Sequence, residues 1–203
     1  MTARNVAWSE GSWTTEPVST ETVGGELLVE AAKGSDFWQK TLYGFERASG
    51  HALLCAWDER NAVEVSFELQ GFDELYDQAG LVLWVSNEQW IKAGVEVNDG
   101  VFCVGAVVTD GHSDWSLAPV PDWGGSRVTI RASRSKDAVI LRARAAGHAW
   151  RTIRVCRFEP RSAAQAGPFV CAPERAGFTV RFTRWTFTEP DEALHWSPPA
   201  DEP

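Results

Sequence analysis

Apolar and polar residues alternate with a period of two along most of the chain, and almost no stretch shows the 3.6-residue period of a surface helix. The alternating segments are punctuated by Gly, Asn, Asp and Pro, as at Asn98-Asp99-Gly100 and Thr109-Asp110-Gly111, which suit the positive φ of tight hairpin turns. We predict strands over residues 26–31, 52–57, 62–69, 79–86, 90–97, 101–109, 127–132, 138–145, 150–158 and 177–187. Many short strands joined by tight turns predict an all-β jelly-roll sandwich with mostly antiparallel pairing.

Residues 76–100, "YDQAGLVLWVSNEQWIKAGVEVNDG", predict a hairpin whose two faces differ in chemistry. Successive side chains of a strand point to opposite faces, so residues 79, 81, 83 and 85 share an apolar face with residues 91, 93, 95 and 97. The other face carries Gln78, Gly80, Trp84, Lys92, Gly94 and Glu96. A plain solvated face would explain polar residues alone. The two glycines, however, leave room above the sheet, as at the close approach of a ligand or another backbone, and therefore favour a concave binding surface.

Aromatic residues gather in two further segments, "SDFWQKTLYGF" (35–45) and "VVTDGHSDWS" (107–116). The chain has eleven tryptophans, of which we assign about half to the core because a buried indole supplies a large apolar area. The others are candidates for stacking on sugars or flat rings, with nearby polar side chains binding hydroxyls or carboxylates. The predicted ligand-binding residues are Trp38, Tyr43, Gln78, Trp84, Lys92, Glu96, Asp114, Trp115, Arg142 and Arg144, the two arginines forming a basic wall.

Charge is unevenly distributed along the chain, whose net charge is -9. Residues 127–161 hold ten Arg or Lys against two acids, whereas residues 1–126 hold six against twenty. The simplest interpretation is that a basic group of strands is complemented by acidic neighbours; a basic surface for a phosphate or a carboxylated sugar is the alternative. The acidic total and the lack of a nucleic-acid-binding motif lead us to expect no nucleic-acid partner.

The length of 203 residues fits one domain, which we place at residues 1–188. Residues 189–203 change to Pro and acidic residues and are expected to be a disordered tail. The sequence has no apolar run long enough for a membrane span and no secretion signal, so we expect no membrane partner and a cytoplasmic location. Four widely spaced cysteines are expected to be free thiols.

Four segments in this order, "DFWQKTLYGF", "YDQAGLVLWVSNEQWIKAGVEVNDG", "VVTDGHSDWS" and "AGPFVCAPERAGFTVRF", resemble the regulation-of-enolase protein family, a domain of unknown function in the concanavalin A-like superfamily. The resemblance spans roughly residues 25–188 and implies a concanavalin A-like jelly roll with a concave face. It departs at "TLYGF", where Leu42 stands in place of an expected histidine. The family also implies a possible protein partner, a metabolic enzyme such as enolase.

The function predicted from these observations is a non-catalytic binding module for a carbohydrate or small polar ligand. Regulation of a metabolic enzyme through protein contacts and glycoside hydrolysis are the two alternatives. A hydrolase would use Glu96 with Asp114 or Asp77 as its carboxyl pair, but the Glu-x-Asp-x-Glu motif of related jelly-roll hydrolases is absent. Lys92 is expected to keep Glu96 ionised, which favours binding over acid catalysis. No residue spacing indicates a metal site or a cofactor.

Overall fold

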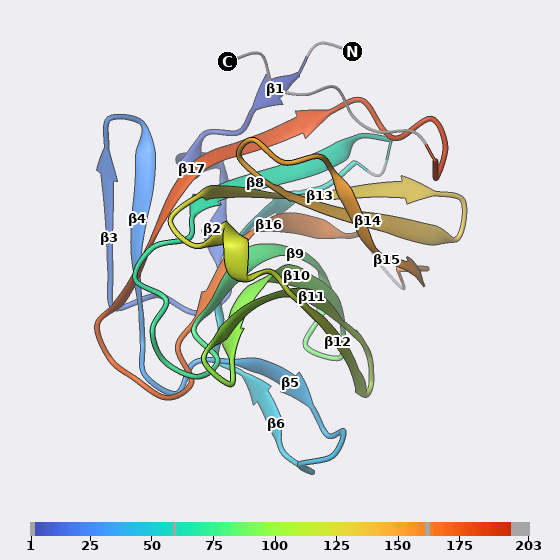
Figure 1. Cartoon of the computed structure of the whole chain (residues 1–203). Helices are drawn as coiled ribbons and strands as arrows, with labels where there is room; N and C mark the ends of the chain where they lie inside the picture. Colours follow the sequence, from blue (N-terminus) through green and yellow to red (C-terminus); the bar gives the residue numbers. More distant parts are fainter. Residues whose placement is uncertain (1–2, 59, 161–162, 196–203) are drawn as a thin grey trace.

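Two large antiparallel sheets stacked face to face form the body of the protein (Figure 1). The structure is a computed structural model that describes residues 3–58, 60–160 and 163–195. Every pairing between its named strands is antiparallel, as the prediction of a jelly-roll sandwich requires. Two short 3₁₀ helices, Trp8–Glu10 and Pro121–Trp123, connect strands. The predicted fold class is confirmed.

We call the eight-stranded sheet the arginine sheet, because its outer face carries buried arginines. Its order is β15 (Arg151–Arg157), β14 (Ala138–Ala145), β13 (Arg127–Ser135), β8 (Ala62–Glu68), β17 (Phe178–Thr188), β4 (Glu26–Ala31) and β3 (Ser19–Val23), with β1 (Arg4–Asn5) also paired to β17.

We call the seven-stranded sheet the pocket sheet. Its order is β12 (Ser113–Pro119), β11 (Val101–Asp110), β10 (Gln89–Asn98), β9 (Gln78–Ser86), β16 (Gln165–Cys171), β7 (His51–Ala56) and β2 (Ser12–Trp13). Strands β9 to β12 curve over a separate two-stranded hairpin, β5 (Phe37–Gln39) and β6 (Glu46–Ala48), which lies on the concave side of this sheet (Figure 1).

The main hydrophobic core lies between the two sheets. Alternation places Leu81 and Ile91 of the pocket sheet in one buried cluster with Val65 and Ile130 of the arginine sheet. Each of these side chains is almost fully buried, which stabilises the fold by roughly 1.5–3 kcal/mol per side chain. The apolar faces predicted for the 79–86 and 90–97 strands do face this core.

The two glycines of this hairpin are required by a close approach of the neighbouring backbones. Gly80 of β9 pairs with Gly94 of β10. A Cβ on Gly80 would lie 2.1 Å from the carbonyl oxygen of Ala93, and a Cβ on Gly94 would lie 2.1 Å from that of Ala79. Only glycine avoids this clash. These glycines are therefore required by the approach of another backbone, the second of the two interpretations, and Gly94 also lines a small hollow beside Lys92 and Glu96.

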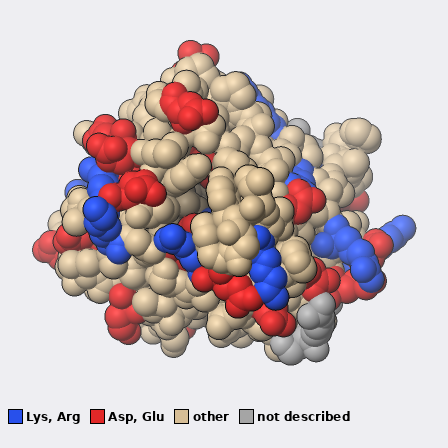
Figure 2. All heavy atoms as spheres, turned by 90° about the horizontal axis from the view of Figure 1, so that it is seen from below, with Lys and Arg blue, Asp and Glu red and all other residues tan. Residues whose placement is uncertain are grey.

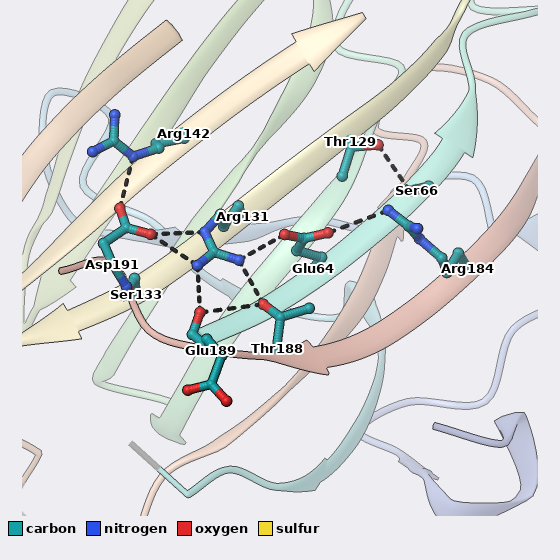
Figure 3. A network of polar contacts seen from close by, with 10 residues as sticks. All are labelled: Glu64, Ser66, Thr129, Arg131, Ser133, Arg142, Arg184, Thr188, Glu189 and Asp191. Atoms are coloured by element: carbon teal, nitrogen blue, oxygen red, sulfur yellow. Dashed lines mark hydrogen bonds and ion pairs between the residues drawn. The ribbon is translucent and has the colours of Figure 1, made fainter. Parts of the chain in front are cut away.

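On the outer face of the arginine sheet, a buried ion-pair network fixes the chain that follows β17 (Figure 3). Asp191, whose side chain is fully buried, lies between two arginines. Its Oδ1 accepts from Arg131 Nε at 2.8 Å, and its Oδ2 accepts from Arg142 Nε at 2.7 Å. Arg131 also pairs with Glu64 at 2.6 Å, and the backbone N–H of Asp191 donates to Ser133 Oγ at 2.8 Å. The basic strands are therefore complemented by acids, which agrees with the simpler interpretation of the charge asymmetry.

This network corrects the prediction that the chain is disordered from residue 189 onwards. Asp191 is held by two arginines, and Arg142 Nη2 donates to the carbonyl of Leu194 at 2.8 Å. Nothing in the sequence indicates this order, because the partners of Asp191, which are Arg131 and Arg142, lie about fifty residues or more away in the chain. The remainder of the predicted tail, 196–203, lies outside the described residues.

Candidate functional site

A cavity of about 230 Å³ lies between the concave face of the pocket sheet and the β5–β6 hairpin. The sheet and its connections contribute Tyr76, Gln78, Lys92, Glu96, Val107, Trp115, Pro173 and Glu174, and the hairpin region contributes Asp36, Trp38, Tyr43, Phe45 and Arg47. Figure 2 views the molecule from this side and shows acidic and basic side chains interspersed, with no continuous patch of one sign. The cavity thus combines an aromatic surface with charges of both signs.

Strand register brings the polar floor of the cavity together. Lys92 of β10 is opposite Val107 of β11, which is opposite Trp115 of β12. Glu96 is opposite Gln78 of β9. Because side chains two residues apart share a face, Lys92 and Glu96 both point toward the hairpin, as the sequence pattern predicts.

Lys92 is a buried cation whose hydrogen bonds are made within the protein. Its Nζ donates to Gln78 Oε1 at 2.7 Å and to Asp36 Oδ1 at 3.2 Å, and it lies 5.9 Å from the centre of the Trp90 ring. Burial by itself disfavours the ammonium, but the carboxylate of Asp36, together with Cys171 and Glu96, outweighs that effect, so the pKa of Lys92 is raised. Lys92 therefore stays charged and ties the hairpin to the sheet through Asp36.

Glu96 is a titratable group of the floor whose pKa lies near neutrality. Burial raises the pKa of its carboxyl from 4.5 to about 7, and the opposing attraction of Lys92 and a hydrogen bond from Trp115 do not cancel that effect. Its Oε1 is buried and accepts no hydrogen bond from the described residues. Lys92 does lower the pKa of Glu96, as predicted, but burial outweighs this effect, and the Lys92 ammonium is paired with Asp36.

The walls of the cavity are aromatic and come mainly from the hairpin. Trp38 meets Trp115 edge to face with 6.3 Å between ring centres, and it meets Tyr43 at 5.8 Å. Tyr43 stacks on Phe45 at 5.2 Å. Burial and a hydrogen bond to Tyr43 raise the pKa of Tyr76 to about 12, so the Tyr76 phenol stays neutral near pH 7. The predicted placement of Trp38, Tyr43 and Trp115 agrees with this arrangement.

Trp84 packs beneath the β5–β6 hairpin and does not line the cavity. It is buried, stacks parallel to Trp90 with 6.4 Å between ring centres, and packs against Phe37 at 5.2 Å. These rings form a second apolar cluster beneath β5. The face assigned to Trp84 was right, but hairpin packing covers the indole that was predicted to stack on a ligand.

Three other predicted site residues lie elsewhere. Asp114 is largely exposed and pairs with Arg154 at 3.0 Å; it adjoins Trp115 in one strand, so the two side chains point to opposite faces. Arg142 binds Asp191 on the arginine sheet, and Arg144 lies 4.5 Å over the Trp150 ring. The predicted basic wall therefore does not border this cavity.

Several cavity residues were not among the predicted site residues. Asp36 and Phe45 lie in the aromatic segment that was singled out, so their proximity to the site could have been inferred from it. Tyr76 and Glu174 come from turns and loops, where no periodicity indicates the direction of a side chain, and Arg47 comes from the three-residue strand β6, which is too short to show a period. Their contribution depends on how the hairpin folds back over the sheet.

No cluster of three or more metal-ligating side chains occurs among residues 3–58, 60–160 and 163–195. His51, a possible ligand by residue type, has both ring nitrogens bonded to backbone: Nε2 accepts from the N–H of Ala32 at 3.0 Å, and Nδ1 lies 3.0 Å from the carbonyl oxygen of Thr15. Cys171 is buried, which raises the pKa of its thiol. The nearby cation in the sequence, Arg175, pairs with Asp77 at 2.7 Å. His51 and Cys171 are therefore structural.

Within residues 3–58, 60–160 and 163–195, the protein has no helix with the length and apolar composition needed to cross a bilayer.

Comparison with known proteins places this chain among proteins of similar sequence and fold. Residues 13–190 match the family described as "Protein of unknown function (DUF1349)". The chain is 34% identical over 197 residues to "Regulation of enolase protein 1" of Saccharomyces cerevisiae, covering 95% of this chain and 97% of the yeast protein. A crystal structure of a functionally unknown protein from Saccharomyces cerevisiae superposes with a TM-score of 0.81 at 32% identity, covering 91% of this chain and 99% of that one.

More distant structures share only the fold. A xylan beta-1,4-xylosidase from Bacillus halodurans C-125 superposes with a TM-score of 0.68 at 16% identity. The match covers 91% of this chain but only 38% of the enzyme. At this identity the likeness shows a common β-sandwich architecture and says nothing about catalysis.

Proposed function

The chain belongs to the family described as "Protein of unknown function (DUF1349)", and from that premise we propose that it is a non-catalytic binding module. Its ligand is a carbohydrate or another small polar molecule, which enters the cavity between the pocket sheet and the β5–β6 hairpin. The observation that carries this proposal is the buried Oε1 of Glu96, which has no hydrogen-bond partner among the described residues and lies in an aromatic-lined cavity. A buried polar atom without a partner costs about 1–3 kcal/mol, so a ligand that supplies a donor would gain that energy.

The cavity walls suit a ring with one apolar face. Trp38 and Trp115 present indole surface, while Gln78 and Glu96 offer polar atoms at the floor. This combination of a mostly apolar lining with a few convergent polar groups is typical of small-ligand sites. The interspersed charges of this face also favour a small ligand over a polyanion (Figure 2).

Substitution of Trp115 by Leu is expected to weaken binding of a sugar ligand by roughly tenfold or more, because it removes stacking surface and the hydrogen bond to Glu96. Ligands are first found by thermal shift with a panel of mono- and disaccharides, and affinities are then measured by titration calorimetry. Trp150→Leu is the matched control: Trp150 is also half-buried, but it lies outside the cavity. Equal affinities for the wild type and Trp115→Leu would show that this cavity is not the site, and no binding of any sugar would exclude a carbohydrate as the ligand.

Hydrolysis is the second candidate, because Glu96 has a pKa suited to proton transfer and Asp36 lines the same cavity. The same sugars and a set of polysaccharides are therefore assayed for new reducing ends. If the wild type releases reducing ends and Glu96→Gln does not, the protein is a hydrolase and the proposal of a non-catalytic binding module is refuted.

The name of the yeast relative suggests a protein partner instead, since the similarity covers 95% of this chain. On this alternative, purified enolase is expected to bind the wild-type chain in a surface-plasmon experiment. The hairpin tip exposes Leu42, Tyr43 and Phe45, and the double variant Leu42→Ser, Phe45→Ser tests whether it is the contact. No detectable association with enolase would remove this alternative and leave the ligand-binding proposal in place.

A further inference from the structure

The charged residues of the cavity do not balance one another. Asp36 and Lys92 form an ion pair and neutralise each other. The lining then retains Arg47, Glu96 and Glu174. With Glu96 ionised, three carboxylates face two cations, so the lining carries one net negative charge, which the addition of one positive charge would cancel.

The aromatic wall already accommodates a cation. The guanidinium of Arg47 lies 4.6 Å over the ring of Phe45, and Phe45 stacks on Tyr43. A cation over an aromatic face is attracted by the ring quadrupole, and the attraction strengthens when water is excluded. Trp38 and Trp115 add two more rings to the same cavity.

At the floor, the unpartnered Oε1 of Glu96 is the acceptor that a cation would meet. We propose that the preferred ligand is a sugar ring bearing one protonated amine, with the ammonium bonded to Glu96 and the ring against Trp38 and Trp115. This inference rests on the proposed function and specifies its ligand class. A 2-amino-2-deoxyhexose has the required size and charge.

Ammonium binding requires Glu96 to be ionised, so the proton on the carboxyl leaves to solvent when the ligand enters. The raised pKa of Glu96 reflects a buried charge without sufficient compensation, and an adjacent ammonium would lower it. The charged and titratable groups that surround Glu96 or share its cavity are Lys92, Asp36, Cys103, Tyr43, Tyr76, Arg47 and Glu174. Below pH 7 the amine is charged and Glu96 is mostly protonated, which makes the proton release measurable.

The test is titration calorimetry at pH 6.0 with glucosamine, glucose, N-acetylglucosamine and glucuronate, in two buffers that differ in ionisation enthalpy. Glucosamine is expected to bind the wild type at least tenfold more tightly than glucose or N-acetylglucosamine, whose nitrogen is uncharged. Glucosamine binding is expected to release between about half a proton and one proton. The reason is that an opposite charge beside a carboxyl lowers the pKa of that carboxyl by roughly one to three pH units. In Glu96→Gln the ratio of glucosamine to glucose affinity falls toward one. Glu192→Gln, which changes an exposed residue outside the cavity, keeps the wild-type ratio.

Each remaining outcome separates the inference from the proposed function. Equal binding of glucose and glucosamine, or tighter binding of glucuronate, overturns the amine preference but leaves a sugar-binding site. Absence of binding by all four sugars and by the wider panel overturns both. Proton release is measured on the wild type alone, so the test survives if Glu96→Gln folds poorly.

Discussion

Replacing Asp191 by Asn is expected to lower the free energy of unfolding by about 3–5 kcal/mol, because it removes the charge that two buried arginines share. Arg131 and Arg142 are 2% and 3% exposed, and both donate to the Asp191 carboxylate at 2.7–2.8 Å. Asparagine keeps the size and one acceptor oxygen but leaves Arg142 without a carboxylate partner among the described residues. Arg131 retains Glu64. The measurement is urea unfolding at pH 7, followed by tryptophan fluorescence.

Glu192→Gln is the matched control for this experiment. It removes one negative charge from the neighbouring, exposed position of the same segment, and it is expected to change stability by no more than about 0.5 kcal/mol. High salt is expected to leave the loss in Asp191→Asn largely unchanged, because buried ion pairs are screened little. Similar unfolding curves for the two variants would show that the network in Figure 3 contributes no more than a surface charge.

Sequence alternation predicted the parts of the fold whose strands have one apolar and one polar face. All ten predicted strands occur, with ends shifted by three residues or fewer. The missed strands lack this signal. Strand β16 sits between β9 and β7 but contains Gly167 and Pro168, residues that argue against a central strand. Strand β12 is mostly polar or exposed, and β5 and β6 have three residues each.

The sequence predicted the site residues that lie in long strands, because alternation sets the direction of their side chains. It missed most of those in loops and short elements, where no such rule applies. Gln78, Lys92 and Glu96 were placed correctly, because the period of two sets their face. The same alternation puts Asp114 and Trp115, which are adjacent in β12, on opposite faces, so the two could not both line the cavity. Asp36 was missed as the partner of Lys92, because the contact spans 56 positions and depends on how the hairpin folds over the sheet. The effect of burial on the pKa of Glu96 was missed for the same reason, since sequence spacing reports neighbouring charges but not burial.

The buried carboxyl of Glu96 is expected to make the protein less stable as the pH rises from 4.5 to 7. Its folded-state pKa is about 7, against 4.5 when exposed. Between these values the folded protein holds a proton that the unfolded chain has released, so each rise in pH favours unfolding. The stabilising contribution is complete below pH 4.5 and is lost by about pH 7, a change of about 3 kcal/mol. Glu96→Gln removes the titrating group and is expected to abolish this part of the pH dependence.

The difference in unfolding free energy between the wild type and Glu96→Gln, measured every half pH unit from about 2.5 to 8.5, isolates this contribution from other titrating groups. The unfolding free energy of the wild type should fall relative to that of Glu96→Gln between pH 4.5 and 7, and the difference should stay constant above pH 7. Glu10→Gln provides a contrast of opposite sign: hydrogen bonds to Ala7 and Arg4 lower the pKa of Glu10, so its stabilising effect is present at high pH and disappears as the pH falls below 4.5. A flat difference for Glu96→Gln would mean that its carboxyl is solvated or paired. The unsatisfied acceptor at the floor of the cavity, on which the ligand proposal rests, would then be absent.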